Sequence, residues 1–228
     1  MKKGSRDGGI SVRVMAVITV IVFGAGIFAG FLFSYGPLAG ISGAAAGSGT
    51  GVYDLNLVIT TNNWYNNTIG YQPAYFVVHD GKLYSSASIT IPASVPIAIT
   101  IVNYDSGTAV VASQFANVTG TRGGNVFLVN DTNVNSTTGA TGTGILVNGG
   151  VSITSVPSNA IAHTFTIFLN GKTVVNIPVM PFSTEFATFV LSPGVYHWQC
   201  EALCGSGPYG DAGAMLSAGW MNGMLKVG

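Results

Sequence analysis

Sulfur-bearing residues are concentrated near the C-terminal end of the chain. Both cysteines, Cys200 and Cys204, and three of the methionines lie after residue 194. Thiolate and thioether sulfurs are soft ligands, and proteins use them to bind copper(I). Copper binding is therefore the first chemistry that the sequence suggests.

The stretch 195–200 has the alternating pattern of a short β-strand. Successive side chains of a strand point to opposite faces of the sheet. Cys200 therefore shares a face with Tyr196 and Trp198, whereas His197 lies on the other face. Because the aromatic pair should face the core, we expect Cys200 to point inward and His197 to point outward.

A second strand is predicted within residues 160–170 (AIAHTFTIFLN). His163 falls on the same face as most of the apolar residues of this stretch, with mainly small or polar residues on the other face. We therefore expect His163 to face the core, either as a hydrogen-bonded core histidine or as a metal ligand. An inward imidazole and an inward thiol on two strands are the elements of a copper site in a β-sandwich.

Residues 157–169 (PSNAIAHTFTIFL) and 193–228 (PGVYHWQCEALCG through GWMNGMLKVG) resemble the cupredoxin superfamily. The resemblance is strongest to subunit II of haem-copper oxidases and to the archaeal sulfocyanins, and it covers about the last third of the chain well. It implies that His163 is the first histidine ligand, that Cys200 and Cys204 are the two bridging thiolates, and that Met221 is the terminal methionine. Copper is the cofactor that this resemblance implies.

The chain departs from that pattern at the second imidazole. Subunit II carries a histidine four residues after its second cysteine, where this chain has Pro208, and no histidine follows His197. A blue copper site needs two histidines, so the set is complete only if His79 or His197 is recruited. The predicted ligands are otherwise as follows: His163, Cys200, Cys204, Met215 and Met221. This set favours Cu(I) over Cu(II).

Two other states of the cysteines remain open at this point. In an oxidising compartment, Cys200 and Cys204 could form a disulfide, since a three-residue spacer with a turn can bring their Cα atoms close enough. Gly205, Gly207 and Pro208 would favour such a turn. The thiols could also be free and bind no metal.

The N-terminal region predicts a membrane anchor. Residues 12–35 carry no charge apart from Arg13, are dominated by apolar residues and are long enough to cross a bilayer as a helix. Basic residues precede the span, so the N-terminus is expected in the cytoplasm and the rest outside. The alternative is a signal peptide cleaved near residues 44–46, although the apolar run is longer than such peptides need. We expect a cytoplasmic tail and anchor at 1–35 and a Gly/Ala/Ser linker at 36–51.

Charge and motifs exclude several functional classes. Only 7% of the residues are charged, and the part after the anchor has four basic side chains against seven acidic ones. A mildly acidic domain offers no basic surface for phosphate contacts, so nucleic acid is not expected as a partner. No hydrolase motif is present, which favours an electron carrier or an oxidase subunit over a free-standing enzyme.

The region 52–228 is predicted to be one all-β domain. Short runs rich in valine, isoleucine, threonine and aromatic residues alternate with glycine, asparagine and proline, which is typical of a β-sandwich. HDGK at 79–82 and NGK at 170–172 carry hairpin-turn signals. The fold class is therefore a Greek-key, cupredoxin-like β-sandwich with one N-terminal transmembrane helix. Residues 106–157 are interpreted as an inserted hairpin or lid.

Four Asn-x-Ser/Thr sequons, at Asn66, Asn117, Asn130 and Asn135, would suit an extracytoplasmic glycoprotein. The function expected from all of these features is a membrane-anchored copper protein that exchanges electrons with a respiratory oxidase or another redox protein. The alternatives are a metal-free domain that serves as a structural or docking part of an oxidase, and a copper-handling or surface protein with no redox partner.

Overall fold

The computed structural model describes residues 51–130, 150–205 and 213–228. The expected anchor at 12–35 and nearly all of the linker lie outside these residues, as do Asn135 and Pro208. Within the described residues, no helix has the length and apolar character needed to span a membrane. Anchoring therefore stays a prediction from the sequence.

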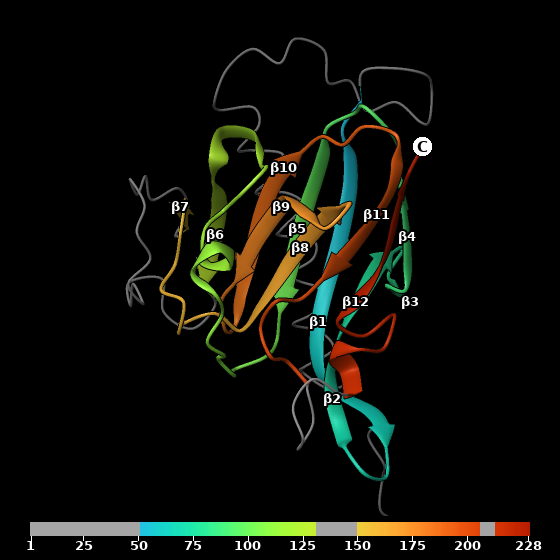
Figure 1. Ribbon diagram of the computed structural model, residues 1–228, viewed down its shortest axis with the longest axis vertical. Helices are drawn as coiled ribbons and strands as arrows, with labels where there is room; N and C mark the ends of the chain where they lie inside the picture. Colours follow the sequence, from blue (N-terminus) through green and yellow to red (C-terminus); the bar gives the residue numbers. More distant parts are fainter. Residues whose placement is uncertain (1–50, 131–149, 206–212) are drawn as a thin grey trace, which may run out of the picture. The chain divides into compact units, whose positions relative to one another are not determined.

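The described residues form two β-sheets (Figure 1). The seven-stranded sheet has the order β3-β2-β1-β5-β10-β6-β7, and the five-stranded sheet has the order β4-β12-β11-β8-β9. The strands are β1 (Tyr53–Asn66), β2 (Gly70–His79), β3 (Lys82–Ser85), β4 (Ser88–Ile91), β5 (Ile97–Asn103), β6 (Val126–Asn130), β7 (Val151–Ile153), β8 (His163–Leu169), β9 (Lys172–Val179), β10 (Ser183–Phe189), β11 (Gly194–Gln199) and β12 (Asn222–Val227). Three short 3₁₀ helices connect them: η1 (Ser113–Ala116), η2 (Arg122–Gly124) and η3 (Gly213–Met215).

The core lies between the two sheets and is built from alternate residues of each strand. β1 and β5 contribute leucines and isoleucines such as Ile59 and Ile99, which are almost fully buried. The facing sheet contributes Phe165 and Trp198 to the same cluster. Burying one such side chain stabilises the fold by about 1.5–3 kcal/mol relative to exposing it. The predicted two-sheet sandwich is therefore confirmed.

Two pairs of strands in the sandwich are parallel, whereas the other pairs are antiparallel. β1 runs parallel to β5, and β12 runs parallel to β4. The cause is a change of sheet along the chain: β4 pairs in the five-stranded sheet, and β5 then returns to lie beside β1. Such a crossover lets a later strand run in the same direction as an earlier one.

Both predicted hairpin turns are confirmed. In the β2–β3 turn, Asp80 and Gly81 have φ values of 48° and 70°. In the β8–β9 turn, Asn170 and Gly171 have φ values of 52° and 74°. Two successive residues with positive φ are the requirement of the two-residue type I′ turn, which Asp-Gly and Asn-Gly satisfy at little cost.

The outer face of β8 and β9 is covered, which the sequence did not predict. Thr164 and Thr166 point away from the apolar core but are fully buried. Asn176 on β9 donates hydrogen bonds to the carbonyls of Phe115 and Asn117, and its Oδ1 accepts one from Thr166. The 113–119 segment therefore lies over this face.

Within residues 106–157, β6 and β7 form an antiparallel pair at the edge of the seven-stranded sheet. This pair, η2 and the segment over β8 and β9 lie within the described part of the stretch. The interpretation of 106–157 as an insertion stays a prediction.

Candidate metal centre

β8 and β11 bring His163 and Cys200 together. The two strands are antiparallel neighbours, so the beginning of β8, at His163, lies beside the end of β11. Cys200 comes directly after that end, and its sulfur accepts a hydrogen bond from the Thr164 N–H at 3.4 Å. Cys204 follows in a turn in which its own N–H donates to the Ala202 carbonyl.

The three side chains form a compact, buried group. His163 Nδ1 lies 2.8 Å from the Cys204 sulfur and 3.9 Å from the Cys200 sulfur, and the two sulfurs are 3.4 Å apart. All the potential ligand atoms lie within 4.8 Å of one another. The predicted inward orientation of His163 and Cys200 is confirmed, and both cysteines are free thiols in this structure.

Asp105 completes the surroundings of the imidazole. Its Oδ2 lies 3.0 Å from His163 Nε2, and the side chain of Asp105 is 21% exposed. A carboxylate can only accept a hydrogen bond, so Nε2 carries the proton and Nδ1 is the nitrogen directed at the sulfurs. Metal-binding histidines commonly donate their second N–H to a carboxylate in this way. The donor atoms therefore have the chemistry of a site for a soft metal.

The pKa values of the two thiols are shifted in opposite directions. Burial raises the pKa of Cys200, but hydrogen bonds from Cys204 and His163, the charge of His163 and the Thr164 N–H together lower it well below its usual value. Burial and the neighbouring Cys200 thiolate raise the pKa of Cys204 well above its usual value. One negative charge on the pair is therefore favoured over two when no metal is bound.

Without a metal, the surroundings of His163 favour the protonated imidazole. Burial lowers its pKa, but the hydrogen bonds and charges of Asp105 and Cys200 outweigh burial and raise it to about 9. Asp105 has a lowered pKa, chiefly through its hydrogen bond with His163. A metal ion would replace the proton on Nδ1 and the thiol proton, so its binding should release protons.

The two predicted methionine ligands are both buried, and Met221 lies next to Cys200. The Met221 carbonyl accepts a hydrogen bond from the Cys200 N–H at 2.8 Å, which places the two residues opposite each other. Met215 lies in η3 and is 8% exposed. Ligation by either methionine sulfur stays a prediction.

The other histidines do not supply the missing second imidazole. His79 lies at the end of β2, its side chain is 74% exposed, and it contacts Asp80. His197 lies on the outer face of β11 and hydrogen-bonds Gln199. Of the three histidines of the chain, all of which the structure describes, only His163 has its imidazole beside the Cys200 and Cys204 sulfurs.

Aromatic side chains exclude water from one side of the group. The rings of Tyr75 and His163 make an edge contact with a centroid distance of 6.3 Å. Tyr75 also packs against Trp198 and Phe165 and donates its hydroxyl to the Thr164 carbonyl. All of these rings are buried, so the metal centre would lie in a region of low polarity.

Comparisons with known proteins give weak structural similarity and no sequence match. No protein-family model matches the chain, and no curated protein matches it. Reduced rusticyanin is 14% identical over 79% of this chain and 81% of that chain, with a TM-score of 0.32. The multicopper oxidase of Campylobacter jejuni is 9% identical over 82% of this chain and 32% of that chain, with a TM-score of 0.32. The sandwich and its His–Cys–Cys group are established by the strands and distances of this chain.

Asp105 and Tyr75 are the site residues that sequence reasoning missed. Asp105 is 58 residues away from His163, on the loop after β5, and it belongs to no recognisable motif. The sequence distinguishes Asp105 only as one of seven acidic residues after the predicted anchor. Which of these acidic residues contacts His163 becomes clear only when the two sheets are placed face to face.

Proposed function

We propose that this protein is a cupredoxin-like copper protein that transfers single electrons. The observation that carries the proposal is the buried group of one imidazole and two thiols within 4.8 Å, with Asp105 on the far nitrogen of His163. Nitrogen and thiolate ligands of this kind suit copper. The sequence resemblance to oxidase subunit II and sulfocyanins supports the same cofactor.

The protein residues would hold the ligands in nearly fixed positions. His163 and Cys200 are attached to paired strands, and Asp105 fixes the orientation of the imidazole. Copper, when bound, would supply the one-electron chemistry. Rigid ligands keep the geometry similar in both oxidation states, and the buried aromatic residues exclude solvent, which tunes the reduction potential.

Copper handling without a redox partner is the second candidate function. It is favoured by the single imidazole, because a thiolate-rich set with one nitrogen stabilises Cu(I) over Cu(II). An electron carrier must be stable in both states, whereas a copper store or carrier needs only Cu(I). Cyclic reduction and oxidation of the loaded protein distinguishes these functions.

Titration of the full-length protein with Cu(I), Cu(II) and Zn(II) tests the proposal. We expect copper to bind with a thiolate-to-copper absorption band and to cycle between two oxidation states. Cys200→Ser should abolish the band. The matched control His79→Ala should retain it, because His79 is exposed at the end of β2 and contacts Asp80. Binding of Zn(II) alone, or of no metal, would contradict the copper assignment.

We further propose that the domain lies outside the cytoplasm, attached to the cell membrane by residues 12–35. Basic residues before this span and apolar residues within it support the orientation. A respiratory oxidase or another membrane redox protein would then be the partner. Protease added to intact cells should digest the domain, whereas protection of the domain until the cells are lysed would reverse the orientation. Glycans on Asn66 or Asn117 would support the same location.

A further inference from the structure

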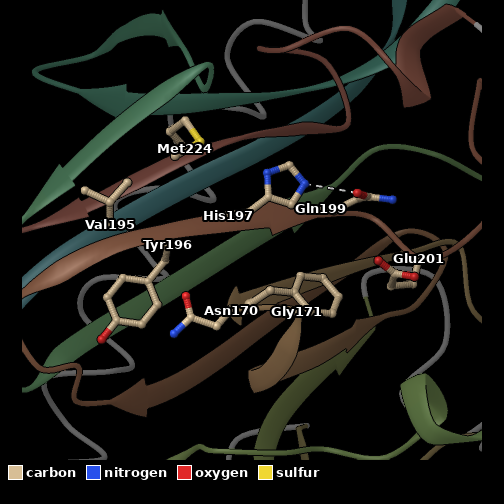
Figure 2. Close-up of a pocket in the computed structure, with 9 residues that line it drawn as sticks. Asn170, Gly171, Val195, Tyr196, His197, Gln199, Glu201 and Met224 are labelled. Atoms are coloured by element: carbon tan, nitrogen blue, oxygen red, sulfur yellow. Dashed lines mark hydrogen bonds between the residues drawn. The ribbon is translucent and has the colours of Figure 1, made fainter.

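The outer face of the five-stranded sheet carries an open groove of about 470 Å³. Residues of β8, β11 and β12 line it, together with Glu201 (Figure 2). Because side chains alternate along a strand, His197 in this groove points to the opposite face from Cys200. The groove is not used by the buried metal centre. Its polar and sulfur-bearing side chains therefore need a separate explanation.

His197 and Met224 are direct neighbours in this groove. They are paired across β11 and β12, and Met224 is 41% exposed. Residues opposite each other in an antiparallel pair have Cβ atoms about 4.5–5.5 Å apart, on the same face of the sheet. On the β8 side, the ring of Phe168 packs against the imidazole at a centroid distance of 6.4 Å and limits its rotation.

Gln199 determines which imidazole nitrogen is available. His197 Nε2 lies 3.0 Å from Gln199 Oε1, as the dashed line in Figure 2 shows. The amide oxygen can only accept, so with this amide orientation Nε2 carries the hydrogen and donates it. The lone pair of a neutral imidazole is then on Nδ1, the nitrogen that remains free to bind a ligand.

We propose that His197 Nδ1 and the Met224 thioether form a surface site for a soft monovalent cation, Cu(I). A nitrogen and a thioether together match the ligand preference of Cu(I), and a carbonyl oxygen on the far N–H is the usual second partner of a metal-binding histidine. The carboxylate of Glu201 lines the same groove and adds negative charge to it. The open groove leaves space for a third ligand from outside the protein.

The surface site and the buried centre are distinct but close. His197 and Cys200 are three residues apart on one stretch of chain, which corresponds to about 10 Å. Alternation directs them to opposite faces of the sheet. The surface site does not depend on the proposed electron transfer, and it is expected to fill even when both cysteines are blocked.

Silver(I), a redox-inert substitute for Cu(I), provides a direct test. The full-length protein, labelled with ¹³C at its methionine methyl groups and with alkylated or serine-substituted cysteines, is titrated with Ag(I). The chain has six methionines, and Met224→Leu assigns the Met224 signal. We expect that signal to shift at low Ag(I) and the shift to disappear in His197→Gln, while His79→Gln retains it as a matched surface control.

Gln199 gives a second, graded measurement. Gln199→Leu removes the acceptor on Nε2 and should weaken Cu(I) binding at this site about 10–100-fold in competition with a chromophoric chelator. Gln199→Glu keeps an acceptor and should bind Cu(I) at least as tightly as the wild type. A Met224 shift that persists in His197→Gln, or Cu(I) affinity unchanged by Gln199→Leu, would overturn the site.

Discussion

The Asp105 carboxylate lies 3.0 Å from His163 Nε2, although the two residues are 58 positions apart in the sequence. Asp105 lies on the loop that follows β5 of the seven-stranded sheet, and His163 is the first residue of β8 in the opposite sheet. The pair therefore links the two layers at the end of the sandwich where the sulfurs lie. It also determines that Nδ1 faces those sulfurs.

Replacing Asp105 should weaken metal binding without unfolding the domain. In Asp105→Asn the side chain keeps its size but loses its charge, so the imidazole is a weaker and less well oriented ligand. We expect copper affinity to fall about 10–100-fold, measured by competition with a chelator of known affinity. Asp80→Asn is the matched control, since Asp80 contacts the exposed His79. Equal losses in both variants would contradict a role for Asp105 at the centre.

The metal-free protein should contain one thiolate at neutral pH. Cys200 has a lowered pKa and Cys204 a raised one, so the two thiols should ionise in separate steps. Thiolate absorbance in the ultraviolet, followed against pH, should show the first step below the usual range of a cysteine. Cys200→Ser should remove that step. Absence of any reactive thiol in freshly isolated, denatured protein would instead indicate a disulfide.

Glu185 should make the stability of the protein depend on pH. Its carboxyl group is buried, and Ser183 Oγ lies 2.5 Å from both Glu185 Oε1 and the Met180 carbonyl. Burial raises the pKa of Glu185 to about 8, against hydrogen bonds from Ser183 and Met180 that lower it.

Because the folded pKa of Glu185 exceeds the unfolded value of 4.5, its contribution to stability is full below pH 4.5 and is lost as pH rises toward 8. The slope from this group is at most about 1.4 kcal/mol per pH unit. Glu185→Gln should flatten the dependence of the unfolding free energy on pH over this interval. Urea unfolding of the metal-free protein measures it, and an unchanged slope in the variant would contradict a protonated Glu185.

The cover over β8 and β9 should depend on Asn176. Its amide donates to two carbonyls of the 113–119 segment and accepts from Thr166, and the Asn176 side chain itself is fully buried. Asn176→Ala would leave these groups without partners, at a cost of about 1–3 kcal/mol for each unsatisfied group. We expect a large loss of stability in denaturant unfolding, and faster amide hydrogen exchange at Val118 and Thr119. Asn125→Ala, which loses a single partly buried contact with Ser152, should cost much less.

The sequence predicted the parts of the fold that depend on local pattern. Alternation along β8 and β11 correctly placed His163 and Cys200 inward and His197 outward. The Asp-Gly and Asn-Gly pairs correctly located two hairpins. These features depend on residues adjacent in the chain, where side-chain periodicity and backbone preference act directly.

The features that the sequence missed depend on long-range pairing. The parallel partners of β1 and β12 follow from a change of sheet between β3 and β5, which no local signal indicates. Burial of Thr164 and Thr166 depends on a segment about 50 residues earlier in the chain. Asp105 could be identified as a partner of His163 only once the two sheets were placed face to face.

Both ends of the described domain enter the sandwich as interior strands. β1 is flanked by β2 and β5, and β12 by β11 and β4. The β12–β4 pair joins Met224 to Ser88, so it must wait for most of the chain to emerge from the ribosome. Non-local pairing of this kind slows folding. Until β12 is in place, β11, the strand that leads into Cys200, has an open edge, which is a template for association between chains. The interval before β12 pairs is thus a stage at which this edge needs protection from aggregation.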